Sequence, residues 1–222
     1  MPLNIKIISP IKIDKADLRR RKMRYGEYAG PDTKIEVFNL PEGPATLDSP
    51  GDLLFCEHAV FQEGIKTDPD EFDAILIDCV FDPAVDALRE QCEVPTFGPM
   101  FATLPLVSQV ADKFSYVARS KRQTHWLSEL ATRYGYGDRL ASARALKISY
   151  QDSRSPKIFD EAMSRNLKLA VQEDGAEAIV MGSTTMAISE AVSAAAQGRP
   201  LFLPGMVTLR LMELLWGDGL LI

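Results

Sequence analysis

The stretch DAILIDC at residues 73–79 recurs later in the chain as EAIVMGS at residues 177–183. The copies are 104 residues apart (183 minus 79), and the acid, Ala, Ile and two further apolar positions coincide. Each copy leads to a second short strand between prolines, PTFGP at 95–99 and PLFLP at 200–204, at an offset of 105 (200 minus 95). Buried strands share few residue types, so chance is the alternative. The matching acid and prolines favour duplication of a half-domain.

Apolar runs alternate with helical patterns along the whole chain. Strands are predicted at 3–8, 34–39, 73–79, 115–118, 145–149, 176–181 and 201–203. Helices are predicted near 52–64, 84–91, 100–112, 122–134, 156–174, 186–197 and 207–216. Nearly continuous apolar runs indicate parallel strands that are covered by helices on both faces.

The repeat therefore predicts an α/β fold with two pseudo-symmetric lobes, each a short parallel sheet flanked by helices. The first lobe is expected at 1–99 plus 200–222 and carries Cys79, and the second at 100–199 carries Ser183. Ligands of open α/β sheets bind beyond the carboxyl ends of the strands. The active site is therefore expected in a cleft between the lobes, with Cys79 facing Ser183.

Composition indicates a small-molecule partner. The chain has 222 residues, a hydrophobic fraction of 46% and a net charge of -6, so nucleic acid would be repelled. The basic cluster at 19–24 is interpreted as a solvated face or mobile loop rather than a phosphate site. The strand-like start and the lack of a run of ~18 apolar residues predict no signal peptide and no membrane span.

Three cysteines without a CxxC or a His/Cys zinc spacing predict neither a disulfide framework nor a metal site. The thiols are expected to be free in a reducing cytoplasm. Cys56 and Cys92 are interpreted as packing residues. No metal is expected, and a homo-oligomer stays open.

The segment 77–83, leading to 94–98, resembles the first cysteine motif of the aspartate/glutamate/hydantoin racemases. Residues 177–186 resemble the second motif, and residues 43–48 resemble a Gly-Pro segment that precedes a helix in hydantoin racemases. Maleate isomerases and arylmalonate decarboxylases are also similar. The resemblance implies a cofactor-independent enzyme that moves a proton at the carbon alpha to a carboxylate or amide carbonyl. A thiol suits this role because its pKa of about 8.5 can be tuned.

The chain departs from this pattern at Ser183, where racemases carry a second cysteine. Serine is a poorer proton acceptor, which puts a symmetric two-thiol racemisation in doubt. Three alternatives stay open: a one-thiol decarboxylase, a hydrolase of the same fold, and a binding protein that has lost catalysis. A second departure is Ser9-Pro10-Ile11, where hydantoin racemases show Asn-Pro-Asn. It suggests a ligand other than a hydantoin or free amino acid.

Cys79 and Ser183 are the predicted catalytic pair, and both are expected to precede helix N-termini that favour anions. The substrate, a small carboxylate or cyclic amide, is expected to contact Ser9, Val80, Phe81, Ser120, Thr184 and Thr185. Ser120 can equally be a helix N-cap. His125 and His58 are interpreted first as surface residues. Asp82, before Pro83, is interpreted first as the cap of the next helix.

Overall fold

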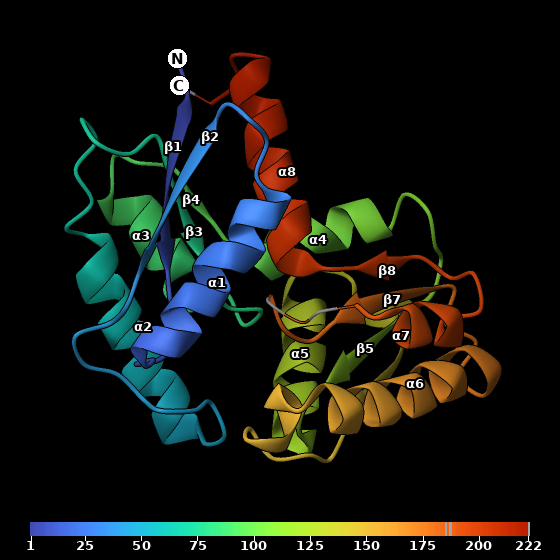
Figure 1. Ribbon diagram of the computed structural model, residues 1–222. Coiled ribbons are helices and arrows are strands. Elements are labelled where there is room, and N and C mark those ends of the chain that lie inside the picture. Colours follow the sequence, from blue (N-terminus) through green and yellow to red (C-terminus); the bar gives the residue numbers. More distant parts are fainter. Residues whose placement is uncertain (185, 187, 222) are drawn as a thin grey trace. The chain divides into compact units, whose positions relative to one another are not determined.

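The computed structural model describes residues 1–184, 186 and 188–221 and divides the chain into two units. Unit 1 comprises Met1–Ala102 and Gly205–Ile222, and unit 2 comprises Thr103–Pro204. Each unit contains a four-stranded, all-parallel sheet flanked by helices, which confirms the predicted α/β class (Figure 1). In the described part of the chain, no helix has the length and apolarity that a membrane span requires.

Unit 1 is built on a sheet of order β2-β1-β3-β4. Its strands are β1 (Leu3–Ile8), β2 (Thr33–Phe38), β3 (Ala74–Ile77) and β4 (Thr96–Phe97). Apolar side chains of α1 (Lys15–Tyr28) and α8 (Pro204–Gly217) share one core cluster with β1 and β3. Figure 1 shows α2 (Pro50–Gly64) and α3 (Val85–Gln91) on the other side of this sheet. The sheet is therefore covered on both faces, as its apolar strands predict.

Unit 2 repeats the pattern with the order β6-β5-β7-β8. Its strands are β5 (Phe114–Ala118), β6 (Leu140–Ala145), β7 (Ala178–Met181) and β8 (Leu201–Phe202). The helices α6 (Pro156–Gln172) and α7 (Glu190–Ala195) pack in one core cluster with β5 and β7, and α5 (Lys121–Arg133) covers the other face (Figure 1). Short 3-10 turns lie at Gly137–Arg139 and Asp152–Arg154.

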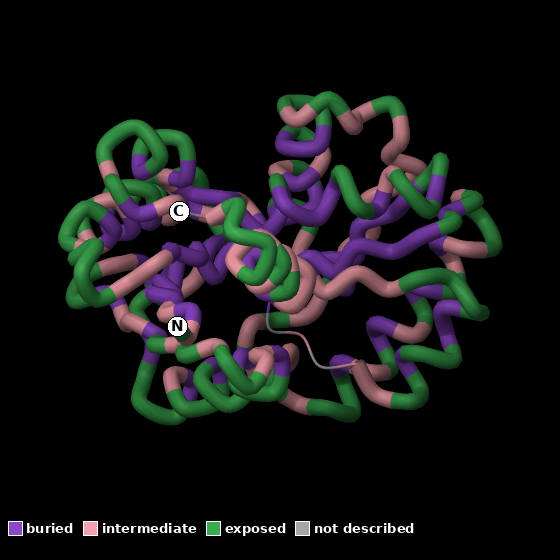
Figure 2. Tube along the Cα trace, turned by 90° about the horizontal axis from the view of Figure 1, so that it is seen from above, coloured by how far each residue is buried: buried purple, intermediate pink, exposed green. Residues whose placement is uncertain are grey.

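The internal repeat is present in the topology. The strands β3 and β7 start 104 residues apart (178 minus 74), and β4 and β8 start 105 apart (201 minus 96). Every residue of β3 and β7 is fully buried. Figure 2 shows buried segments, in purple, enclosed by exposed segments, in green. The two copies therefore occupy equivalent central places in their own sheets.

Two expectations are wrong. The strand predicted at 145–149 lies at 140–145, because β6 is an edge strand without a fully buried residue and so shows no apolar run. The basic cluster is neither a loop nor a wholly solvated face. It belongs to α1, whose buried residues are Asp17, Arg21, Tyr25 and Tyr28.

Gly182, directly after β7, marks a close approach of two strands. A Cβ at this position would lie 2.4 Å from the Cβ of Ala118 and 2.8 Å from the carbonyl oxygen of Val117. Neither neighbour is the mobile end of a long side chain. We expect Gly182→Ala to lower the free energy of unfolding by about 1–3 kcal/mol, the usual cost of overpacking. Denaturant titration measures this change.

Gly26 supplies the matched control for that substitution. It lies within α1, and a Cβ there would meet no atom within 4 Å. Alanine has the higher helix propensity, so Gly26→Ala is expected to raise the free energy of unfolding by about 0.5–1 kcal/mol. An equal loss of stability in both variants would contradict the close approach at Gly182.

Candidate active site

Cys79 lies just beyond the carboxyl end of β3. The N–H of Asp78 donates to the carbonyl of Ile8 at 2.9 Å, which extends the pairing of β1 and β3 by one residue. The N–H of Cys79 then donates to the carbonyl of Ile77 at 2.7 Å, so the chain turns at the cysteine. Only 5% of Cys79 is exposed. The thiol is thus held by the sheet and is largely shielded from water.

The turn after Cys79 is fixed by Asp82. Its N–H donates to the carbonyl of Cys79 at 3.2 Å, and its carboxylate accepts the N–H groups of Met100 at 3.0 Å and Phe101 at 2.8 Å. These donors belong to the first turn of α4 (Pro99–Val107). The expectation that Asp82 caps the next helix is therefore wrong: α3 has no side-chain cap, and Asp82 caps α4 instead.

Two backbone features fit this turn closely. Asp82 has a φ of 50°, which an aspartate tolerates better than most residues. A Cβ on Gly98 would lie 2.6 Å from Cγ of Asp82, so the glycine makes room for the carboxylate. The second strand of the repeat motif and the cysteine turn are in this way fitted to one another.

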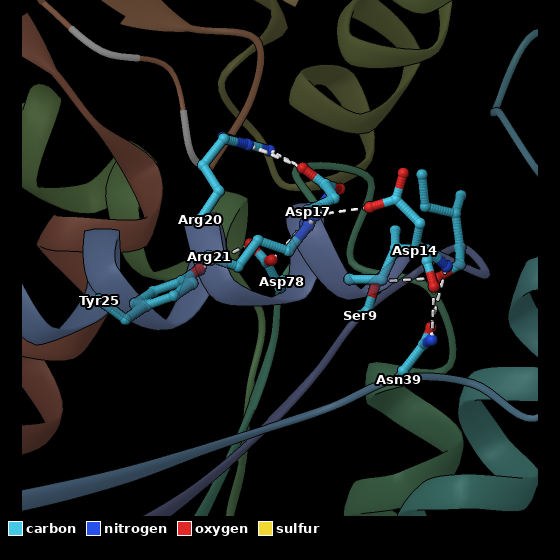
Figure 3. Close-up of polar contacts among 10 residues, drawn as sticks. Ser9, Asp14, Asp17, Arg20, Arg21, Tyr25, Asn39 and Asp78 are labelled. Atoms are coloured by element: carbon cyan, nitrogen blue, oxygen red, sulfur yellow. Dashed lines mark hydrogen bonds and ion pairs between the residues drawn. The ribbon is translucent and has the colours of Figure 1, made fainter.

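A buried polar network surrounds the carboxylate of Asp78, the residue that precedes Cys79 (Figure 3). The carboxylate of Asp78 accepts a hydrogen bond from the hydroxyl of Tyr25 at 2.7 Å and forms an ion pair with Arg21. Nε of Arg21 also donates to Asp17 at 3.2 Å, and Asp17 in turn accepts from Nε of Arg20 at 2.7 Å. The network joins α1 to the residue that precedes Cys79.

The surroundings of Cys79 favour the protonated thiol. Burial raises its pKa well above the ordinary value, and Cys56, Asp82 and Asp78 act in the same direction. A backbone hydrogen bond at Phe81 lowers the pKa and opposes them. The resting thiol is therefore a proton donor.

The helix α3 starts where it was predicted, whereas α7 starts later than predicted. The helix α3 begins at Val85, six residues after Cys79 (85 minus 79), and α7 begins at Glu190, seven after Ser183 (190 minus 183). A backbone donor to the sulfur lies within the turn, at Phe81.

Ser183 follows β7 as Cys79 follows β3. The N–H of Gly182 donates to the carbonyl of Val117 at 2.8 Å, the counterpart of the bond from Asp78 to Ile8. Ser183 is partly exposed and Thr184 is 3% exposed. The third predicted contact of this loop, Thr185, lies outside the described residues. In its own unit, the serine thus holds the place that the thiol holds in the other.

Ser9 follows β1, beside the motif of unit 1. Its side chain is fully buried, and the hydroxyl donates to the carbonyl of Ile11 at 2.9 Å. Asn39 holds the same loop through two hydrogen bonds to the backbone of Ile13, at 2.9 and 2.6 Å (Figure 3). The hydroxyl proton of Ser9 is therefore used within the loop, and the hydroxyl oxygen of Ser9 can still accept a hydrogen bond.

The remaining predicted residues divide by exposure. Val80 is buried beside the thiol, whereas Phe81 is partly exposed. The hydroxyl of Ser120 accepts the N–H of Gln123 at 3.3 Å, which confirms its reading as the N-cap of α5. His125 is 63% exposed and lies 3.5 Å from Glu129, which makes it a surface residue. Among the described side chains, no three His, Cys, Asp or Glu residues are grouped as metal ligands.

The sequence interpretation missed the network of α1. The signal was present in the spacing of its buried residues, 17, 21, 25 and 28, which repeats at helical intervals. Because two of the four are charged, the pattern does not show as an apolar stripe. Asp14, which accepts the N–H of Asp17 at 2.7 Å, marks the helix start.

The chain has two units of like topology, each with a parallel four-stranded sheet, and a buried thiol at the end of one strand. These features define the class of protein to which it is similar. The profile of the Asp/Glu/Hydantoin racemase family matches residues 21–212. A hydantoin racemase of Pseudomonas sp. (strain NS671) is 32% identical over 160 residues, covering 72% of this chain and 64% of that protein. This match spans less than two thirds of the relative's length. The chain belongs to the Asp/Glu/hydantoin racemase family.

Solved structures share the fold. The allantoin racemase from Klebsiella pneumoniae superimposes with a TM-score of 0.88 at 22% identity, covering 99% of this chain and 89% of that one. A maleate isomerase from Pseudomonas putida S16 gives 0.68 at 15% identity, covering 99% and 93%. An arylmalonate decarboxylase gives 0.62 at 14%, covering 96% and 92%. The resemblance that the two motifs indicated is thereby confirmed.

Proposed function

We propose that this chain is a cofactor-independent racemase or isomerase that breaks and remakes the C–H bond next to an amide or carboxylate carbonyl. Cys79 is the proton donor and acceptor. The observation that carries the proposal is the position of Cys79 in its unit: a buried thiol at the carboxyl end of a central strand, in a turn braced by Asp82. Such bracing limits the movement of a group that must reach one carbon atom.

The names of the relatives indicate the substrate class. The matched racemases act on hydantoin and allantoin, which are cyclic amides. In allantoin and in 5-substituted hydantoins, a ring carbon bearing one hydrogen lies beside a carbonyl. The sulfur of Cys79 as thiolate takes this proton, and the electron pair of the C–H bond moves to the carbonyl oxygen as an enolate. Return of a proton to either face of the carbon completes the exchange.

Ser183 and Thr184 have the complementary role in this proposal. Their hydroxyl groups donate hydrogen bonds to the developing oxyanion, which is stabilised most strongly where water is excluded. The internal repeat pairs position 183 with position 79 and supports their action on one substrate. A serine hydroxyl is a weak acid, so Ser183 returns the proton slowly and the two faces of the carbon are treated unequally.

A second candidate function is one-sided protonation after loss of carbon dioxide. The observation that favours it is the raised pKa of Cys79, because a protonated thiol is ready to donate but not to accept. Here the C–C bond to a carboxylate breaks, its electron pair forms the enolate, and the S–H of Cys79 protonates the carbon. The product would then have a single configuration.

The pH dependence separates the two functions. Proton abstraction requires the thiolate. The pKa of Cys79 is raised, and burial is the largest cause. The abstraction rate is therefore expected to rise about tenfold per pH unit below that pKa. A rate limited by donation from the thiol stays level there and falls above the pKa. Chiral chromatography of allantoin and 5-methylhydantoin measures the first, and carbon dioxide release from a 2-substituted malonate measures the second.

The same assay includes a control variant. Cys92, partly exposed on the far end of α3, is a matched thiol outside the proposed site, so Cys92→Ala is expected to keep both profiles. If none of these compounds were racemised or decarboxylated at any pH tested, the proposed function would be contradicted.

A further inference from the structure

Asp78 places a carboxylate next to the thiol, inside the core. Its side chain is inaccessible to solvent, and Asp78 as a residue is 1% exposed. An uncompensated buried charge costs several kcal/mol, so such a group is paired or takes up a proton. The carboxylate of Asp78 therefore requires a partner, and that partner lies close to Cys79.

Arg21 and Tyr25 are that partner. They lie one turn apart on the buried face of α1, and both contact the carboxylate of Asp78. Arg21 is 6% exposed and Tyr25 is fully buried. Burial opposes ionisation of Asp17, but Arg21 and Arg20 outweigh it and keep its carboxyl pKa below the usual value. The arginine at Asp78 is thus itself held from behind by an ionised group.

The second copy of the repeat shows that the fold does not need this arrangement. Gly182 occupies the place of Asp78, at the offset of 104 residues (182 minus 78), and makes the equivalent backbone hydrogen bond. It carries no side chain and so needs no counter-charge. The carboxylate with its arginine is present in the unit that carries the thiol and absent at the equivalent position of the unit that carries the serine.

We infer that Arg21, Tyr25 and Asp78 are positioning residues of Cys79: they anchor the cysteine turn to α1 and balance the charge beside the sulfur. This inference deepens the proposed function and rests on it for the role of the thiol. Removing the negative charge of Asp78 alone should lower the pKa of Cys79, and removing the positive charge of Arg21 alone should raise it. Removing both should restore the balance.

Other titratable groups around the thiol are fixed in this comparison. Those facing the sulfur are Cys56 of α2 and Asp82 of the cysteine turn. On α1, Tyr28 interacts with Asp78 and with Arg24. Asp17 of the same helix interacts with Arg21 and Arg20. Apart from Asp78 and Arg21, none of these groups is changed in the test variants, so a shift reports the pair itself.

The test is the pH dependence of alkylation of Cys79 by iodoacetamide, followed at that residue by peptide mass spectrometry. It needs no substrate and no turnover. Asp78→Asn is expected to move the midpoint about 1 pH unit to lower pH, and Arg21→Met about 1 unit to higher pH, as a close charge does. The double variant should lie between the two single variants, and Arg21→Lys should stay near wild type because it keeps the charge.

Arg19→Met is the matched control, since it removes the same charge from the exposed face of the same helix. It should leave the midpoint unchanged. A merely structural role predicts shifts of the same sign, or none, in both single variants, and either result would overturn the inference. If Arg21→Met fails to fold by circular dichroism, a shift to lower pH in Asp78→Asn together with an unchanged midpoint in Arg21→Lys supports the inference, and an unshifted or higher midpoint in Asp78→Asn overturns it.

The outcome is separable from that of the proposed function. Opposite shifts together with full turnover in Cys79→Ala would support the charge balance and reject the catalytic thiol. Unshifted midpoints with lost turnover in Cys79→Ala would reject the charge balance and leave the proposed function standing.

Discussion

Cys79→Ala is expected to lower racemisation or exchange by about 10²–10⁴-fold, the usual contribution of a positioned acid–base group. The physical reason is the absence of a substitute. In unit 1, the carboxylates near the thiol are Asp78, held by Arg21 and Tyr25, and Asp82, held by the first turn of α4. Neither carboxylate is free to take over the proton. Initial rates measured by chiral chromatography give the factor.

Cys56→Ala is the packing comparison for this loss, because it removes a second buried thiol that faces the sulfur of Cys79. Cys56 is fully buried on α2, and burial raises its pKa to about 12, so it holds a proton throughout the working pH range. Its removal leaves a small cavity and is expected to change stability more than rate. Equal rate losses in both variants would show that packing, rather than proton transfer, underlies the effect at Cys79.

Ser183→Cys is expected to raise the rate of racemisation by about 10–100-fold. A thiol has a pKa near 8.5, whereas a serine hydroxyl without an adjacent base is a poor proton acceptor. The substitution restores the residue that the family resemblance places after Gly182. If the chain naturally protonates one face only, the enantiomeric composition of the product should change as well.

Ser193→Cys provides the comparison, because it adds a thiol to the exposed face of α7 in the same unit. It is expected to leave rate and stereochemistry unchanged. An unchanged product composition in Ser183→Cys would contradict the proposal that positions 79 and 183 act on one substrate. A gain in both cysteine variants would indicate a reagent-like effect of any added thiol.

The repeat predicted most of the fold from sequence. The strands β3 and β7 are buried on both faces and therefore consist of consecutive apolar residues. The edge strand β6 could not be recognised in this way, since its residues are only partly buried. The prolines at 95–99 and 200–204 identified β4 and β8 although each has only two residues. Patterns thus fail where a strand has no buried face.

The site was predictable only as far as single residues reveal their neighbours. Cys79 and Ser183 were identified because the repeat aligned them. The partners of Asp78 lie 57 and 53 residues away, on a helix whose buried face is partly charged, and no local pattern connects them. Likewise, Asp82 precedes Pro83 and resembles the cap of the next helix, whereas the fold brings it to the start of α4.

Deuterium wash-in at the ring carbon of 5-methylhydantoin and allantoin, followed by proton NMR in D2O, tests the catalytic thiol most directly. It detects breakage of the C–H bond whether or not the configuration inverts. With wild-type protein, we expect loss of the carbon-bound proton signal at a rate well above that in buffer, and with Cys79→Ala a return to the buffer rate. Wash-in by Cys79→Ala at the wild-type rate would contradict it.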